Sequence, residues 1–179
     1  HCESDMPAEE ILLQLRKYLP EDIGVYSCKN VSPRFHSRLN AKTKTYRYRV
    51  WHSSAPCVFD RRYVYICPGD YDISAMRKAA SFFVGEHDFS AFCANKNMKK
   101  STVRYIASFD IEKTDDEIIF LVTGNGFLHH MVRIMVGTLL EIGRGARKPE
   151  SIQDLFGARR CESGELIPAC GLCLMEVSF

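Results

Sequence analysis

The sequence predicts an α+β fold, with a mainly antiparallel sheet and helices packed mostly on one face. Segments with the period-two alternation of half-buried strands are interspersed with segments whose apolar residues recur at helical spacing. Two strand segments, 103–113 and 117–123, are separated only by a short polar turn, which favours an antiparallel pair. Since no repeat or long linker divides the 179 residues, we expect a single domain over residues 1–179.

Four elements are expected in the first part of the chain. Acidic residues near the start and leucines at helical spacing predict a helix over residues 7–19. Alternating tyrosines and arginines predict a half-buried strand over residues 44–51 with a basic open face, and a second strand follows over residues 63–67. A helix over residues 72–84 has an aspartate as its N-cap, and a glycine ends it.

The later elements follow the strand pair already described. The longest helix is expected over residues 127–142, closed by Gly143-Arg-Gly145. A short helix starts near Pro149, and its apolar residues recur at helical spacing. Residues 172–179 alternate again and should form the last strand.

The composition is that of an ordinary globular protein. Hydrophobic residues make up 46% and charged residues 26%, which excludes disordered and low-complexity classes. The net charge of +2 neither requires nor forbids a nucleic-acid partner. The most apolar stretch, residues 127–142, contains two histidines, an arginine and a glutamate, so we expect no membrane span. Eight cysteines, several inside apolar segments, predict reduced thiols and a cytoplasmic protein.

Arg133 is the most informative single residue. It is expected in the middle of the longest helix, among apolar neighbours and four residues after His129 on the same face. A buried guanidinium is very costly without a partner, so one interpretation is a bond to a carboxylate or a phosphate. The other is a side chain that extends along an apolar surface to solvent. The local sequence favours neither.

Three other patterns have simpler explanations than chemistry. His129 and His130 are adjacent, so on a helix they point about 100° apart, which disfavours a metal site. Cys170 and Cys173 have CxxC spacing, but they run into an alternating segment, where residues three apart face opposite sides, and no second pair completes a zinc site. The glycines of Gly124-Asn-Gly126 either cradle a phosphate at a helix start or form an ordinary turn.

Basic and aromatic residues are interleaved in two segments, 34–38 and 42–49, and lysines add a further basic cluster over residues 96–100. Cations for phosphates together with rings for stacking are what single-stranded or flipped nucleotides require. Composition alone favours the plainer explanation, a solvated strand face whose tyrosines belong to the core.

Six short motifs, taken in order, change this balance. They are Phe35-His-Ser-Arg38, Tyr46-Arg-Tyr48, Gly85-Glu-His-Asp-Phe-Ser-Ala-Phe92, Ser101-Thr-Val-Arg104, Gly124-Asn-Gly-Phe-Leu-His-His-Met-Val-Arg133 and Pro168-Ala-Cys-Gly-Leu-Cys-Leu174. With them the sequence resembles the TruA-type tRNA pseudouridine synthases over nearly its whole length. One small departure is Cys173, where the family often has tyrosine.

The resemblance implies a pseudouridine synthase-like fold and the isomerisation of uridine to pseudouridine at tRNA positions 38–40, in the anticodon stem-loop. It implies a homodimer that binds tRNA and needs no cofactor, metal or membrane. The target base is flipped into a pocket, as in other enzymes that act on bases. By motif position, Tyr46 packs in the pocket and takes a proton from the base, Arg133 pairs with the catalytic aspartate, and Leu172 lines the pocket. The expected RNA contacts are Phe35, His36, Arg38, Arg47, Arg104, Asn125, Phe127, His129 and His130.

The family's catalytic aspartate belongs to a Gly-Arg-Thr-Asp motif, which does not occur in this sequence. In the family that motif lies upstream of everything matched here, and this sequence starts with His rather than Met. We therefore expect the chain to be the C-terminal domain of such an enzyme, inactive on its own. A non-catalytic RNA-binding or dimerisation module is the alternative. A thiol-rich metal protein that uses the CxxC pair and the two adjacent histidines is a distant third.

Overall fold

The computed structural model describes residues 4–95 and 98–179 of the chain. By their contacts the residues fall into two compact units, His1–Asn40 and Ala41–Phe179. Two positions of the lysine cluster, residues 96–97, lie outside the described residues. A single domain over the whole chain stays a prediction from the sequence.

The first unit contains one helix, α1 (Ala8–Tyr18), among its described residues. Acidic residues in its first turn and basic residues in its last turn suit the helix dipole. The Arg16 guanidinium donates to the carbonyls of Val25 and Tyr26, at 2.9 and 3.1 Å. These bonds hold the segment after α1 against the helix, and the helix expected over residues 7–19 is confirmed.

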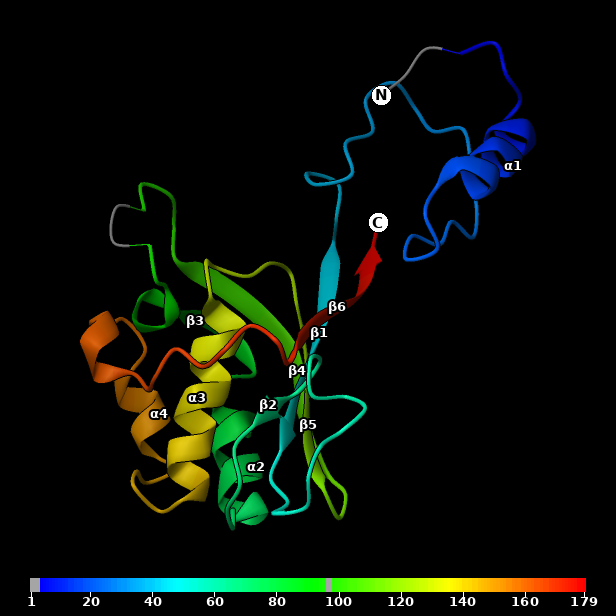
Figure 1. Ribbon diagram of the computed structural model, residues 1–179. Coiled ribbons are helices and arrows are strands. Elements are labelled where there is room, and N and C mark those ends of the chain that lie inside the picture. The colour runs from blue at the N-terminus through cyan, green and yellow to red at the C-terminus, as the bar shows by residue number, and fades with distance from the viewer. Residues whose placement is uncertain (1–3, 96–97) are drawn as a thin grey trace. The chain divides into compact units, whose positions relative to one another are not determined.

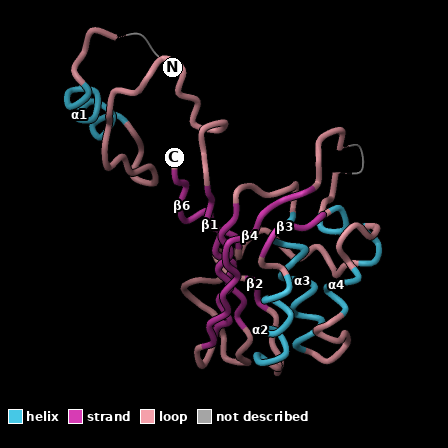
Figure 2. Tube along the Cα trace, turned by 180° about the vertical axis from the view of Figure 1, so that it is seen from behind, coloured by secondary structure: helices cyan, strands magenta, loops and turns pink. Residues whose placement is uncertain are grey.

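The second unit is built on a six-stranded sheet (Figures 1 and 2). Its strands are β1 (Thr43–Trp51), β2 (Tyr65–Ile66), β3 (Gly85–Asp88), β4 (Val103–Lys113), β5 (Glu117–Gly124) and β6 (Leu172–Ser178). The order is β2-β1-β5-β4-β3, and β6 pairs with the first part of β1. Every pair among the described strands is antiparallel except β1 with β2. The expected mainly antiparallel sheet is confirmed.

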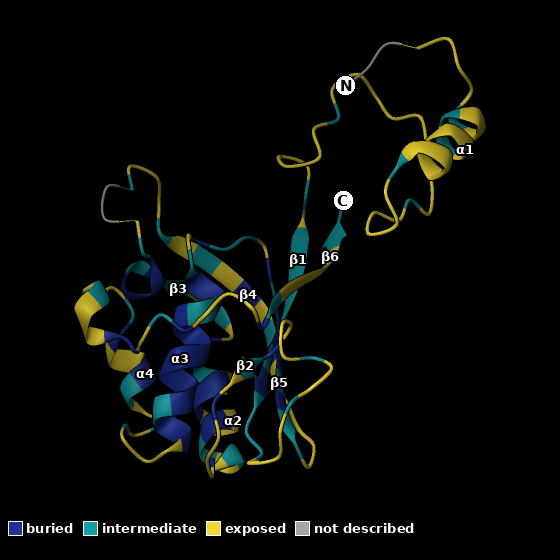
Figure 3. Cartoon of the chain, viewed as in Figure 1, coloured by how far each residue is buried: buried dark blue, intermediate teal, exposed yellow. Residues whose placement is uncertain are grey.

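Helices of this unit cover one face of the sheet, as both views show. They are α2 (Ile73–Phe82), α3 (Met131–Gly143), α4 (Ser151–Asp154) and the short 3₁₀ helices η1 (Ser90–Phe92) and η2 (Arg160–Glu162). Asp72 caps α2, because its side chain accepts a hydrogen bond from the Ala75 amide at 2.9 Å. α3 is buried along most of its length (Figure 3).

The core lies between these helices and the side of the sheet that they cover. Tyr48 and Val50 of β1 are fully buried there, and so are Ile118, Phe120 and Val122 of β5. Burying one large apolar side chain contributes roughly 1.5–3 kcal/mol relative to leaving it exposed. The alternation of these residues therefore determines which face of each strand turns inward.

The start of α3 differs from the sequence prediction. The helix begins at Met131, and residues 127–130 form a loop and turn before it. His130 has φ 64°, in the left-handed region, so the helix cannot extend backward through it. His129 therefore lies outside α3 and does not share a helical face with Arg133, contrary to expectation.

The sheet also differs in two places. The strand expected over residues 63–67 is reduced to the two residues of β2, which run parallel to the end of β1. β3 is not predicted by the sequence, because it is short and has no apolar alternation. Gly85, expected only to end a helix, is the first residue of β3 and has φ 111°.

Candidate active site

A cavity of about 180 Å³ is formed by residues from β1, the turn before α3, α3 itself and the start of β6. We call it the Tyr46 cavity. Its lining residues are Tyr46, Phe127, Leu128, His130, Met131, Val132, Arg133, Ala169 and Leu172. The three residues expected at the catalytic centre, Tyr46, Arg133 and Leu172, thus line one cavity although they are far apart in the sequence.

The alternation of β1 directs Tyr46 toward the helices. Tyr46 lies two residues before the buried Tyr48 and therefore on the same side of the sheet, whereas Arg47 points to the opposite face. The ring of Tyr46 meets the ring of Phe127 edge to face, with centroids 5.1 Å apart and an interplanar angle of 84°. This contact fixes the aromatic wall of the cavity.

A β-bulge lies next to Tyr46. In the pairing of β1 with β6, Thr45 is opposite Glu176, but Tyr46 is opposite Leu174. Met175 is therefore an extra residue on β6. Bulges bend and twist a strand, so β6 changes direction beside the cavity.

Arg133 is half-buried and makes two hydrogen bonds within the protein. Its Nε donates to the Ile167 carbonyl at 2.7 Å, and its Nη1 lies 3.1 Å from Nδ1 of His130. No ion pair among the described residues involves Arg133, and neither bond uses Nη2. Its partners among the described residues are thus a backbone carbonyl and an imidazole, and neither is the carboxylate or phosphate of the first interpretation.

His130 is the residue that ends the turn and precedes α3. Because arginine can only donate, Nδ1 of His130 must be the acceptor in its bond with Arg133. The pKa of His130 is lowered by its burial and by the neighbouring His129 and Arg133, which favours the neutral ring that can accept this bond. The rings of His129 and His130 lie with their centroids 3.7 Å apart.

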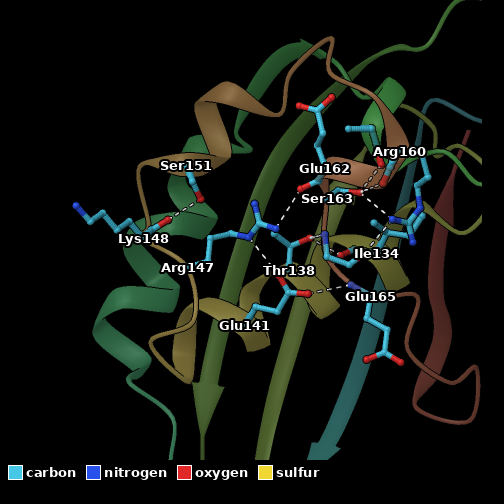
Figure 4. Close-up of polar contacts among 12 residues, drawn as sticks. Ile134, Thr138, Glu141, Arg147, Lys148, Ser151, Arg160, Glu162, Ser163 and Glu165 are labelled. Carbon is cyan, nitrogen blue, oxygen red and sulfur yellow. Dashed lines mark hydrogen bonds and ion pairs between the residues drawn. The ribbon is translucent and has the colours of Figure 1, made fainter.

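The segment that leads to Ala169 is held against α3 by side chains of the helix (Figure 4). Thr138 Oγ1 donates to the Ile134 carbonyl at 2.8 Å and accepts from the Gly164 amide at 3.0 Å. One turn later, Glu141 Oε1 accepts from the Glu165 amide at 3.1 Å. Two of these bonds satisfy the amides of Gly164 and Glu165, which lie outside the strands and helices.

Close packing at Gly137 brings the same segment to Arg133. A Cβ at Gly137 would lie 2.1 Å from the Glu165 carbonyl oxygen, so only glycine permits this approach. Two residues on, the Ile167 carbonyl reaches Arg133, and the next carbonyl, of Pro168, accepts a bond from the Tyr48 hydroxyl. Gly137 belongs to the continuation of the Gly124–Arg133 motif, but sequence reasoning gave it no role and missed the neighbouring Thr138. A small and a polar residue inside an otherwise apolar helix were the signal available.

The expected RNA contacts of the second unit are divided among several places. Phe127 and His130 line the Tyr46 cavity. Four others do not line it, and one of these, Arg47, points to the opposite face of the sheet. Asn125 accepts a hydrogen bond from the Tyr105 amide at 3.0 Å, Arg104 donates to backbone carbonyls beside it, and His129 is exposed.

The first unit contains the other three, Phe35, His36 and Arg38. Phe35 and His36 line a cavity of about 290 Å³ within that unit. The ring nitrogen Nδ1 of His36 accepts from the Arg38 amide at 3.2 Å, while the His36 amide donates to Asn40 Oδ1 at 2.7 Å. His36 thus organises the backbone of its own loop.

The described residues hold no group of three or more side chains suited to bind a metal ion, and none of their helices is long and apolar enough to cross a membrane. Cys170 and Cys173 line the same cavity, on the other face of the sheet. The expectation that they face opposite sides is wrong, because Cys170 lies in the turn before β6, where strand alternation does not apply.

The chain is similar in sequence to several known proteins. The family model of tRNA pseudouridine synthases matches residues 79–179. A tRNA pseudouridine synthase A 1 of Bacillus cereus is 43% identical over 166 residues, which cover 92% of this chain and 67% of that protein. The tRNA pseudouridine synthase A of Halalkalibacterium halodurans is 44% identical over 93% of this chain and 64% of its own length. That of Anoxybacillus flavithermus is 41% identical over 97% and 71%.

The chain therefore spans about two thirds of the length of these relatives. The family match covers more than half of the chain, and it includes α3 and β6, which carry Arg133 and Leu172. The relatives extend the similarity over β1 and most of the remaining sequence. On these grounds the chain belongs to the tRNA pseudouridine synthase family, isomerases that convert uridine in tRNA to pseudouridine.

Proposed function

We propose that the Tyr46 cavity receives a uridine flipped out of the anticodon arm of tRNA, at positions 38–40, for conversion to pseudouridine. The observation that carries this proposal is the meeting of Tyr46, Arg133 and Leu172 in one cavity. Aromatic and apolar walls suit the two faces of a planar base, and Arg133 supplies a cation at the same place. The other expected RNA contacts of the second unit would hold the tRNA near this cavity.

The reaction assigns a different task to each residue. The bond between N1 of the base and C1′ of the sugar breaks, a bond between C5 and C1′ forms, the hydrogen on C5 leaves as a proton, and N1 gains a proton. Tyr46 is the residue that we assign to accept this proton, and Leu172 packs against the base. Each task requires contact with the substrate, which the position of both side chains in the lining permits.

The nucleophile is an aspartate that this sequence does not supply, since the Gly-Arg-Thr-Asp motif is absent from it. Arg133 is suited to pair with that carboxylate, because no bond within the described residues uses its Nη2. A neighbouring guanidinium favours the ionised form of a carboxylate, and only that form attacks. We infer that the chain is inactive without the missing segment.

Two further properties rest on the resemblance in sequence. We propose that the complete enzyme is a homodimer that binds tRNA without a cofactor, and that it acts in the cytoplasm. The described cysteines are all free thiols, which suits a reducing compartment.

Release of tritium from tRNA labelled at uridine C5 tests the proposal. The chain alone should release none, whereas the same chain extended to the start of its reading frame should. Release by the chain alone would point to a carboxylate within it, with Asp88 as the first suspect, although Asp88 already accepts hydrogen bonds from the Ser90 amide and the Thr102 hydroxyl. No release by either protein, with tRNA still bound, would favour a non-catalytic RNA-binding module.

A further inference from the structure

A second cavity, of about 230 Å³, lies on the sheet face that the helices leave open. We call it the Arg47 cavity. Among its lining residues are Arg47 and Arg49 of β1, Asp60 and Tyr63 of the following loop, and Cys170 and Cys173 at the start of β6. Its wall therefore comes from three segments of the chain.

Arg47 differs from Arg49 in its surroundings. Arg49 is paired with two carboxylates, since it donates to Glu117 from Nε at 2.8 Å and to Asp60 from Nη2 at 2.8 Å. The Nε of Arg47 is buried, and no partner for it exists among the described residues. Cross-strand neighbours explain this, because Leu121 on β5 and Cys173 on β6 stand opposite Arg47 and neither offers a carboxylate.

No hydrogen bond or ion pair among the described residues uses the Arg47 guanidinium, which lines the cavity, and an anion bound there would offset the cost of a half-buried charge without a partner. We propose that the Arg47 cavity binds a phosphate oxyanion, supplied by the RNA backbone. The planar fork of arginine matches phosphate oxygens, and Tyr63, which is 67% exposed, adds a hydroxyl at the rim. Asp60 makes its ion pair with Arg49, and no ion pair among the described residues joins it to Arg47.

The position of the cavity supports RNA as the source of the phosphate. Leu172 lines both the Arg47 cavity and the Tyr46 cavity. A base in one cavity and a phosphate in the other would thus lie on two sides of one residue. The choice of RNA rests on the proposed function, whereas the anion site itself rests on Arg47 alone.

The thiol of Cys173 reports on this site without an activity measurement, because it is exposed and stands directly opposite Arg47. Iodoacetate is an anion and iodoacetamide is neutral, and both alkylate the same sulfur. The intrinsic reactivity of the thiol therefore cancels from the ratio of the two rates. The quantity measured is the rate with iodoacetate divided by the rate with iodoacetamide. Arg47→Gln should lower this ratio at Cys173 by about three- to fivefold in low salt, because one positive charge a few ångströms away in water changes the local concentration of an anion by about that factor.

Two controls test whether the lower ratio at Cys173 is due to Arg47 itself. Arg62→Gln removes the same charge from an exposed residue that does not line the cavity, and it should leave the ratio unchanged. The exposed Cys161 provides an internal reference, whose ratio should be equal in all three proteins. Peptide mass spectrometry separates the cysteines, and thermal unfolding verifies that each variant is folded. An equal ratio at Cys173 in wild type and Arg47→Gln overturns the anion site.

Protection experiments identify the source of the phosphate. Inorganic phosphate and an RNA oligonucleotide of the anticodon arm should both slow alkylation of Cys173 in the wild type but not in Arg47→Gln. RNA that binds the chain without protecting Cys173 overturns the proposal and leaves the Tyr46 cavity as the uridine site. Protection by inorganic phosphate in a full-length enzyme that binds no RNA supports the anion site and contradicts RNA as its ligand, together with the proposed function.

Discussion

The guanidinium of Arg133 is oriented by the imidazole of His130, three residues before it, through a contact of 3.1 Å between Nη1 and Nδ1. The left-handed backbone of His130 places its ring at the start of α3, where Arg133 can reach it. Since Nδ1 must accept, the bond exists only while the imidazole is neutral. The charge state of His130 thereby controls how firmly Arg133 is held in the Tyr46 cavity.

Acidification should loosen Arg133. Its neutral partner His130 has a pKa below the ordinary value of 6.5, so protonation and loss of the bond occur only at more acidic pH. In the full-length enzyme kcat should fall on this acid side. His130→Asn keeps an acceptor, tolerates the left-handed backbone and cannot titrate, so it should flatten the fall. His129→Asn is the control; it should keep the fall but move it to higher pH, because His129 lowers the pKa of His130. An identical acid limb in both variants would contradict this role.

Removing the cation from the Tyr46 cavity should slow turnover far more than it weakens tRNA binding. Arg133→Met keeps much of the apolar stem but leaves the aspartate without its partner, and a charge stabiliser of this kind contributes about 10²–10³ in kcat. Single-turnover tritium release by the full-length enzyme measures the effect. Arg133→Lys should recover part of the rate, since it keeps the charge but not the fork. Full turnover in Arg133→Met would show that this side chain only fills space.

Loss of the Tyr46 hydroxyl should also affect the chemical step. Proton transfer by a positioned side chain contributes roughly 10²–10⁴ in rate, so Tyr46→Phe should lower kcat within that range. The ring contact with Phe127 is retained, and the dissociation constant for tRNA should therefore change by less than about threefold. Tyr105→Phe, at a half-exposed tyrosine of β4, is the control. A drop in affinity that matches the drop in kcat would assign Tyr46 to binding instead.

The close contact of α3 with residues 164–167 should be visible in stability. Gly137→Ala places a Cβ 2.1 Å from a backbone carbonyl oxygen, which must move, and overpacking of this kind costs about 1–3 kcal/mol. Urea unfolding of the chain measures this loss. Gly126→Ala adds the same atom at 3.7 Å from its nearest neighbour, an ordinary contact, and should change little. Equal stability of both variants would mean that residues 164–167 do not pack against α3.

Alkaline pH should destabilise the fold through Tyr71. The Tyr71 hydroxyl is buried, donates to the Cys67 carbonyl at 3.0 Å, and accepts from Arg144 at 2.8 Å. Burial, followed by Cys67, raises its pKa from 10.0 to about 12. The unfolded chain therefore loses this proton near pH 10 and the folded chain near pH 12. The stabilisation is complete below pH 10 and is lost as the pH rises toward 12.

Urea unfolding across this range, in wild type and Tyr71→Phe, isolates the contribution of Tyr71. The free energy of unfolding should fall more steeply with pH in the wild type, because the variant has no phenol at this position. Parallel curves would mean that Tyr71 titrates alike in both states. Tyr65, whose pKa is also raised to about 12, is present in both proteins and cancels from the difference.

Much of the fold can be predicted from local sequence patterns, and the predictions that are wrong have identifiable causes. The strand that carries Tyr46 was predicted within one residue of its observed bounds, because its alternation is strong and one face is buried. The start of α3 was misplaced, because Phe127 and Leu128 are apolar in a loop that packs on the cavity, and apolar character alone does not distinguish such a loop from a helical turn. β3 depends on pairing with β4, which its own four residues do not indicate.

The sequence indicates which residues form the site, but not which contacts they make with one another. Motif resemblance singled out Tyr46, Arg133 and Leu172, which the fold then places around one cavity. It did not indicate that Arg133 would bond to the Ile167 carbonyl, since that contact depends on how Gly137 lets a distant segment approach α3. Long-range backbone contacts of this kind leave no periodic signal in the sequence.

The bulge at Met175 divides β6 into two parts that should tolerate length changes differently during evolution. Before it, Leu172 and Cys173 pair in strict register with Tyr48 and Arg47, so one inserted residue would turn each side chain to the wrong face of the sheet. After it, the strand has already absorbed one extra residue, and a further insertion or deletion need not reach the two cavities. Relatives should therefore vary in length after residue 175 and keep a fixed spacing from Gly171 to Leu174.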